Sequence, residues 1–170
     1  LNKYGSDKCT AHPYAAVYDS YFKELEGKEI NLLEIGVLHG ASLMAWREYF
    51  PTGRIVGVDK EDKRTWKHPG VEFVLTDVKN YTPDGLFDVI IDDGSHKPED
   101  IAYTFFKLSE YLKPSGFIII EDVHDEFMPK AWEALAKLEG KLVVEIFNFQ
   151  RILKDPYHNL IIIRKFGVPV

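Results

Sequence analysis

Two acidic segments of the chain carry side chains that could do chemistry. Each follows a run of isoleucines typical of a buried strand: IIDDGSHKPED begins at residue 90 and IIIEDVHD at residue 118. Their strand-end acids are Asp92, Asp93, Glu121 and Asp122. If the two strands are parallel neighbours, we expect Asp93, Glu121 and Asp122 to meet at one sheet edge, where ligands bind in open α/β sheets. Three carboxylates so close repel one another unless a cation or a proton lies among them.

The acids predict a metal site, and the histidine beside them predicts a proton acceptor. Oxygen ligands suit Mg²⁺, with Mn²⁺ or Ca²⁺ as alternatives. A bound ion would lower the pKa of a substrate hydroxyl, and His96, three residues after Asp93, could take its proton. We therefore predict Asp93, Glu121 and Asp122 as metal ligands and His96 as the catalytic base. The other possibility is that the acids only end strands and cap helices, with His96 a surface side chain.

A glycine turn, LLEIGVLHGASL, begins at residue 32 and predicts a nucleoside site. Its spacing, Gly36 followed by Gly40, lacks the third glycine of the dinucleotide pattern G-x-G-x-x-G. Asp59 and Asp77 end the next two apolar runs, where carboxylates could accept the ribose hydroxyls and an exocyclic amine of adenine. Together these features favour S-adenosylmethionine, which has no pyrophosphate. The predicted cofactor contacts are Glu34, Gly36, Gly40, Asp59, Asp77 and Asp92. The alternative is a tight strand-to-helix turn with acids that merely end strands.

Alternating apolar patterns supply the elements that must position these residues. We expect strands at 30–36, 54–59, 71–77, 87–94, 117–122, 141–149 and 159–165. We expect helices at 12–25, 41–50, from Pro98 onward and around 129–139. In the first helix the apolar spacing predicts a buried face made of Tyr14, Val17, Tyr21 and Leu25.

This order of elements predicts an α/β fold: a doubly wound, mostly parallel, seven-stranded sheet. The last two strands have no crossover helix between them, so we expect a C-terminal antiparallel hairpin. Residues 60–70 and 78–86 are short for crossover helices and are expected to be loops.

Bulk composition limits the classes of partner. A length of 170 residues suits one domain, 1–170, with an N-terminal lid or helix at 1–28 and a core at 29–170. The net charge of −6 gives no electrostatic footprint for nucleic acid or an anionic membrane. Cys9 is the single cysteine, which fits a reducing cytoplasm, and no apolar run approaches the roughly 18 residues of a membrane span. We expect a cytoplasmic protein with a small-molecule substrate, and leave a homo-oligomer open.

The motifs taken together resemble the metal-dependent sugar O-methyltransferases of macrolide and tetracenomycin biosynthesis, the macrocin, mycinamicin and rhamnosyl type. The matching stretches are YGSDK, HPY, LLEIGV, GASLMAWREYFP, IVGVD, IIDDGSH and IIIEDV, in this order along the chain. The resemblance implies a Rossmann-like methyltransferase fold and methyl transfer from S-adenosylmethionine to a hydroxyl of a sugar or glycosylated small molecule.

The resemblance also implies roles for individual residues. Asp93, Glu121 and Asp122 would hold Mg²⁺ and His96 would be the base, while Glu34, Gly36 and Asp59 would contact the cofactor. YGSDK would be an N-terminal lid that brings Tyr4, Asp7 or Lys8 near the cofactor, or else a plain turn before the first helix.

Other functions remain as alternatives. A catechol-type or other small-molecule methyltransferase also uses a metal at this edge, but commonly has an Asp-Asn pair where this chain has Glu121 and Asp122. A non-catalytic S-adenosylmethionine-binding module would keep the fold without the chemistry. A nicotinamide oxidoreductase is disfavoured by the missing third glycine.

Overall fold

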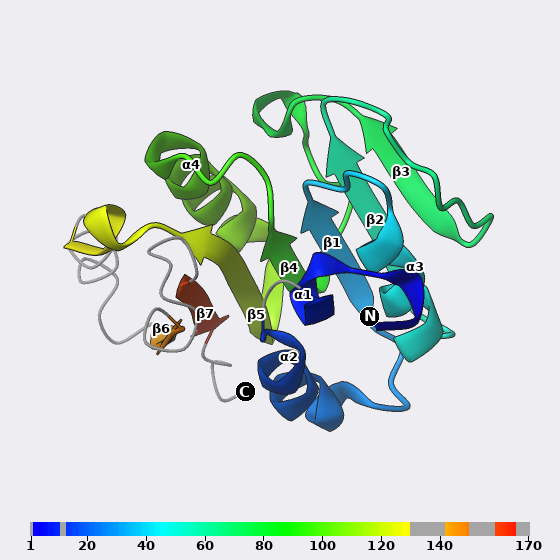
Figure 1. The fold of residues 1–170 in the computed structure, drawn as a ribbon, viewed down its shortest axis with the longest axis horizontal. Helices are drawn as coiled ribbons and strands as arrows, with labels where there is room; N and C mark the ends of the chain where they lie inside the picture. Colours follow the sequence, from blue (N-terminus) through cyan, green and yellow to red (C-terminus); the bar gives the residue numbers. More distant parts are fainter. Residues whose placement is uncertain (1, 11–12, 130–141, 150–158, 166–170) are drawn as a thin grey trace. The chain divides into compact units, whose positions relative to one another are not determined.

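The computed structural model describes residues 2–10, 13–129, 142–149 and 159–165 (Figure 1). The chain divides into two compact units, Leu1–Tyr81 and Thr82–Val170, and each is described by itself. The helix predicted around 129–139 lies, except for its first residue, outside the described residues. Whether the chain acts as one domain stays a prediction.

The first unit contains three parallel strands. Its strands are β1 (Asn31–Ile35), β2 (Arg54–Asp59) and β3 (Val71–Leu75), in the order β3-β2-β1. Helix α3 (Ala41–Tyr49) joins β1 to β2, whereas a loop joins β2 to β3. After β3 a single short 3₁₀ turn, η3 (Val78–Asn80), replaces a crossover helix. These elements confirm the strands, the helix and the loops predicted for this part of the chain.

The N-terminal residues form short helices whose buried face differs from the prediction. They are η1 (Asn2–Tyr4), α1 (Asp7–Thr10), α2 (Ala15–Phe22) and η2 (Lys23–Leu25). Tyr14, Tyr18 and Phe22 are buried, whereas Val17, Tyr21 and Leu25 are only half-buried. The rings of Tyr18 and Phe22 lie 5.1 and 5.4 Å from the ring of Trp46 on α3. The predicted face was therefore right for Tyr14 and wrong for the other three residues, because packing against one large aromatic side chain selected the i, i+4 stripe of rings.

The second unit contains four strands with mixed parallel and antiparallel pairing. Its strands are β4 (Phe87–Asp92), β5 (Leu112–Val123), β6 (Leu142–Asn148) and β7 (Asn159–Lys165), in the order β4-β5-β7-β6. Strands β4 and β5 are parallel, and β7 is antiparallel to both of its neighbours, β5 and β6. The antiparallel pairing of β6 with β7 confirms the predicted C-terminal hairpin. Helix α4 (Pro98–Leu108) begins at its proline, as predicted.

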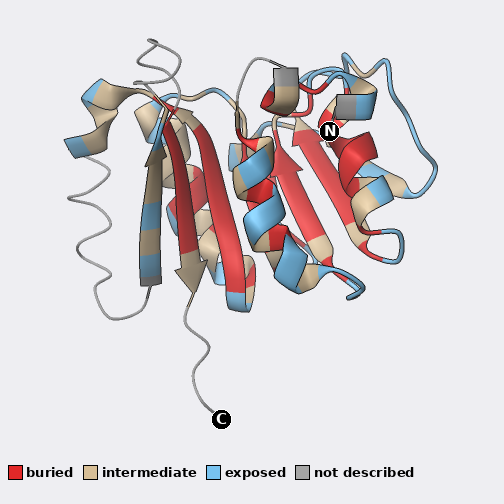
Figure 2. Ribbon diagram, turned by 60° about the horizontal axis from the view of Figure 1, so that its bottom comes forward, coloured by how far each residue is buried: buried red, intermediate tan, exposed pale blue. Residues whose placement is uncertain are grey.

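The strands carry most of the core, and Figure 2 shows several of them largely in the colour of buried residues. Every residue from Val89 to Asp92 on β4, and from Asn159 to Ile163 on β7, is buried. Continuous burial explains why these segments are continuous apolar runs rather than alternating ones. Within the described residues, no helix combines the length and the apolar character that crossing a membrane requires.

Candidate cofactor and metal sites

The glycine turn after β1 depends on two left-handed backbone positions. Gly36 has φ 84° and Gly40, which caps the N-terminus of α3, has φ 81°. Residues with a Cβ rarely adopt this conformation. At Gly40 a Cβ would also lie 2.7 Å from the carbonyl oxygen of Trp66, in the loop after β2. The backbone therefore selects glycine at both predicted positions, whatever the turn binds.

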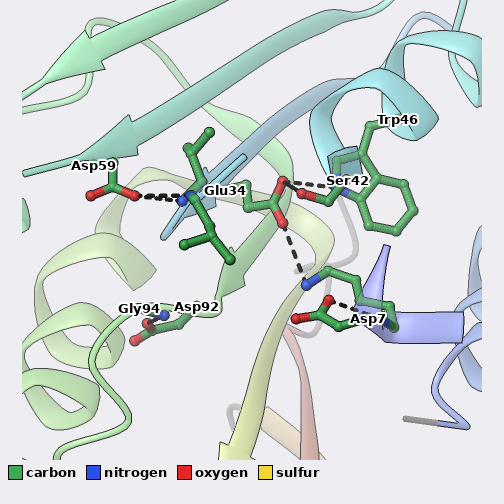
Figure 3. A network of polar contacts seen from close by, with 10 residues as sticks. Asp7, Glu34, Ser42, Trp46, Asp59, Asp92 and Gly94 are labelled. Atoms are coloured by element: carbon green, nitrogen blue, oxygen red, sulfur yellow. Dashed lines mark hydrogen bonds and ion pairs between the residues drawn. The ribbon is translucent and has the colours of Figure 1, made fainter. Parts of the chain in front are cut away.

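Asp59, at the end of β2, stabilises this turn through hydrogen bonds (Figure 3). Its Oδ2 accepts hydrogen bonds from the amides of Val37 and Leu38, at 2.8 and 3.1 Å, and its Oδ1 accepts one from the amide of Glu61 at 3.0 Å. Leu38 has φ 48° and a residue exposure of 54%, so the turn presents an apolar side chain to solvent. The structure brings Asp59 to the glycine turn, and its contact with ribose hydroxyls stays a prediction.

Glu34, on β1 two residues before Gly36, is completely buried. Its Oε2 accepts hydrogen bonds from Ser42 Oγ at 2.9 Å and Trp46 Nε1 at 3.0 Å (Figure 3). Its Oε1 lies 3.6 Å from Lys8 Nζ. Sequence reasoning missed the two partners on α3, although Ser42 and Trp46 have the i, i+4 spacing of one helix face. The described contacts of Glu34 connect β1 to the N-terminal residue Lys8 and to helix α3. Its contact with a cofactor stays a prediction.

Asp77 occupies a different local environment from Asp59. It is exposed, and its Oδ1 accepts a hydrogen bond from the amide of Lys79 at 2.9 Å, which caps the 3₁₀ turn η3. Its predicted contact with adenine is not tested by this geometry.

Asp92, the last residue of β4, is 4% exposed. Burial raises the pKa of its carboxyl to about 6, and the charge of Asp93 adds to this rise. Hydrogen bonds from Thr104 and from the amide of Gly94, and then the charge of His96, oppose the rise in pKa. The Gly94 amide donates to Asp92 Oδ1 at 3.2 Å (Figure 3). The predicted role of Asp92 in cofactor binding stays a prediction.

The structure brings Asp93, His96 and Asp122 together. One ligand atom from each of these half-buried residues lies within 4.8 Å of the others. The strand register explains why these residues lie close together. Asp92 on β4 pairs with Ile120 on β5, so the residues that follow each of them lie at the same edge of the sheet. Glu121 is buried and is not a member of this group. Its predicted role as a metal ligand remains untested. His96, predicted as the base, lies in the group that could bind a metal ion.

Backbone strain accompanies the same three-residue group. His96 has φ 56° and Asp122 has φ 52°, both in the left-handed region. Such conformations cost about 1–3 kcal/mol each and persist only where the surroundings impose them. Near His96 those surroundings include a hydrogen bond of 2.6 Å from Ser95 Oγ to Asp100 Oδ2, which ties the loop to the first turn of α4.

Asn159 on β7 supports the strand end that carries Asp122. Its buried side-chain Nδ2 donates to the carbonyl oxygen of Val123 at 2.8 Å and to Asp125 Oδ1 at 2.6 Å. The pairing of β5 with β7 is irregular between Ile120 and Val123, so these bonds secure an irregular part of the ladder. Sequence reasoning missed Asn159, for which a lone polar residue at the start of an apolar run was the available signal.

Comparison with known proteins identifies the family. A family model described as a methyltransferase domain matches residues 33–123, which include Gly36, Gly40, Asp59 and the strand-end acids of both acidic segments. The chain belongs to this methyltransferase-domain family. That membership confirms the methyltransferase part of the resemblance found in the sequence.

Curated relatives of this methyltransferase domain include O-methyltransferases from Streptomyces. The chain is 32% identical over 141 residues to 8-demethyl-8-alpha-L-rhamnosyl tetracenomycin-C 2'-O-methyltransferase of Streptomyces olivaceus, covering 75% of this chain and 37% of that protein. It is 32% identical over 132 residues to demethylmacrocin O-methyltransferase of Streptomyces fradiae, covering 69% of this chain and 33% of that protein. The chain thus spans about a third of the length of these relatives.

Solved structures agree on the fold of the methyltransferase domain. The MycE methyltransferase from the mycinamycin biosynthetic pathway, in complex with Mg, SAH and mycinamycin VI, has a TM-score of 0.75 and 23% sequence identity. The match covers 99% of this chain and 55% of that one. This similarity confirms the predicted Rossmann-like methyltransferase fold.

Proposed function

We propose that this methyltransferase domain transfers a methyl group from S-adenosylmethionine to a hydroxyl of a sugar or glycosylated small molecule, with a divalent metal ion. The observation that carries the proposal is the group of Asp93, His96 and Asp122, whose ligand atoms lie within 4.8 Å of one another. The two relatives named above are O-methyltransferases of a rhamnosyl tetracenomycin and of demethylmacrocin, which supports a glycosylated acceptor.

The first unit would bind the cofactor. Its glycine turn keeps side chains away from the backbone at Gly36 and Gly40, and Asp59 holds the turn through the amides of Val37 and Leu38. A nucleoside that approaches a backbone closely needs such a turn. The residues present therefore fit S-adenosylmethionine, with Asp59 as the candidate acceptor for the ribose hydroxyls.

The second unit would bind the metal. Two carboxylates and an imidazole fit a divalent ion, and the donor set decides between ions. Carboxylate oxygens alone suit Mg²⁺, while an added imidazole nitrogen favours an ion that accepts both donor types. When bound, such an ion lowers the pKa of a coordinated hydroxyl.

The protein's own part in the reaction concerns the proton. As the acceptor oxygen gains the methyl group, it must lose its hydrogen, and a ring nitrogen of His96 can take it. The carboxylates of Asp93 and Asp122 would stabilise the imidazolium that forms. General base catalysis of this kind contributes typically about 10²–10⁴-fold. A second role is open to His96, because its position in the group also allows it to bind the metal directly.

The proposal is tested by methyl transfer from labelled S-adenosylmethionine to a panel of nucleotide sugars and glycosides, with and without a chelator. We expect at least one glycosylated acceptor to be methylated, and we expect the chelator to abolish turnover. Full turnover after chelation would contradict metal dependence. Binding of S-adenosylhomocysteine without any transfer would favour a non-catalytic binding module.

The role of His96 is separated by measuring activity and metal affinity on one variant. If His96 is the base, His96→Ala lowers turnover by at least about a hundredfold and leaves Mn²⁺ affinity unchanged in calorimetry. If His96 is a ligand, Mn²⁺ affinity falls with turnover. His68→Ala is the matched control, since His68 lies in the first unit and accepts a hydrogen bond from the amide of Gly70. Turnover of His96→Ala within a few-fold of the parent would exclude both roles.

A further inference from the structure

We propose that Lys8 is a positioning residue for cofactor binding, which acts through Glu34 on the glycine turn. The inference rests on the proposed function only for the identity of the ligand. Its physical content is that the docked N-terminal segment, residues 2–10, sets the geometry of the turn from Gly36 to Gly40.

The ion pair of Lys8 with Glu34 is fully removed from solvent. Lys8 Nζ lies 3.6 Å from Glu34 Oε1, and the two side chains are 1% and 0% exposed. A lysine is almost never buried without a charged partner. Removing one partner of such a pair leaves the other charge uncompensated in a poorly solvated environment. The ion pair with Glu34 therefore favours docking of the N-terminal segment in this place.

Glu34 also connects the docked segment to the elements on both sides of the glycine turn. The same carboxylate accepts hydrogen bonds from Ser42 and Trp46, on the helix that Gly40 caps. Glu34 also precedes Gly36 by two residues on β1. One carboxylate thus joins the N-terminal segment, the strand before the turn and the helix after it.

Tyr4, near the other end of the N-terminal segment, is connected to the turn through Trp66. The ring of Tyr4 packs edge-on against that of Trp66, with centroids 5.4 Å apart. The amide of Trp66 in turn donates to the carbonyl oxygen of His39, inside the turn, at 3.0 Å. Tyr4 Oη also donates to Glu48 on α3 at 2.9 Å. Two separate contacts of the segment therefore lead to the glycine turn, which a plain turn before the first helix would not need.

The test combines binding, amide exchange and a double-mutant cycle. Lys8→Met, Glu34→Gln and the double variant are compared with the parent for S-adenosylhomocysteine affinity by calorimetry. We expect each single change to weaken binding at least tenfold. We expect the double variant to bind no more weakly than either single one, because the two residues act as a unit. Additive losses, or affinity of folded Lys8→Met within twofold of the parent, would overturn the proposal.

Amide hydrogen exchange reports on the turn without any ligand. We expect Lys8→Met to speed exchange at Gly36, Val37 and Leu38, whose amides donate to Val58 and Asp59. Residues 161–163 in β7 should be unaffected. Uniformly faster exchange throughout the chain would show a merely stabilising role and would overturn the proposal.

Two further comparisons keep the outcomes distinct. Lys3→Met is the control, because Lys3 belongs to the same segment but pairs with Glu48 in an exposed ion pair, and we expect unchanged affinity. If Lys8→Met does not fold, Lys8→Arg replaces it, and we expect at least a threefold loss of affinity, with an unchanged value contradicting the proposal. If the parent itself binds no S-adenosylhomocysteine, the proposed function fails, while the exchange measurement still decides whether Lys8 positions the turn.

Discussion

Replacing Asp92 with asparagine should stabilise the protein at neutral pH. Burial raises the pKa of the Asp92 carboxyl from 3.8 to about 6. The folded state therefore holds this proton more tightly than the unfolded state does. The contribution of Asp92 to stability is fully present below pH 3.8 and is lost as the pH rises through about 6. An asparagine has no proton to lose and avoids this loss.

The size of the effect follows from the shift in pKa. A change of about two pKa units corresponds to about 3 kcal/mol of unfolding free energy at pH 7.5, and about half of it at pH 5. For a chain of this length that is a rise of about 6–12 °C in Tm. The side-chain oxygen of the asparagine in Asp92→Asn could still accept the hydrogen bond that the Gly94 amide donates to Asp92.

The assay is thermal and denaturant unfolding of the parent and of Asp92→Asn between pH 4.5 and 8, with a chelator present. The chelator matters because a cation bound at Asp93 would favour the charged form of Asp92. Asp88→Asn is the matched control on the same strand, since Asp88 Oδ2 pairs with Lys113 Nζ at 2.8 Å, and we expect no gain in stability there. A gain from Asp92→Asn that does not grow with pH would refute the reasoning.

Two further predictions concern the turn and the metal group. Gly40→Ala should lower unfolding free energy by about 2–3 kcal/mol, combining left-handed strain with the clash at Trp66 O. Gly27→Ala should cost only about 1 kcal/mol by the same denaturant titration, because Gly27 has φ 73° but open space around it; equal costs would contradict the clash. Asn159→Leu should weaken Mn²⁺ binding about tenfold in calorimetry, because it removes the donor that fixes the strand end beside Asp122. Unchanged Mn²⁺ affinity would mean that Asn159 does not position the metal group.

Local patterns predicted most of the strands and helices. Strand β2 has the predicted bounds, 54–59, and α4 begins at Pro98, because apolar runs and a proline at the first helical position act over a few residues. The convergence of Asp93 with Asp122 was also predictable. It needs only that β4 and β5 are parallel neighbours, which the order of elements already suggested.

Side-chain partners within the sites were less predictable. Glu34 was expected at a cofactor, yet its partners in the described structure are Lys8, Ser42 and Trp46. The three-residue group takes in His96, whereas Glu121 is buried outside it. Neighbouring residues on a strand point to opposite faces, so a single step in an irregular strand decides which of two adjacent acids enters a site.

The sequence by itself determined the alternation of strands and helices, the two glycines of the turn and the acids at the strand ends. These features depend on intrinsic backbone conformation and on apolar periodicity, which nearby residues specify. The tertiary structure alone decided which face of α2 is buried and that Lys8 neutralises Glu34, a residue on a different element far along the chain. It also decided that His96 stands beside two carboxylates. Burial and charge pairing between distant segments depend on how the whole chain packs, because a side chain's solvation is set by every element around it.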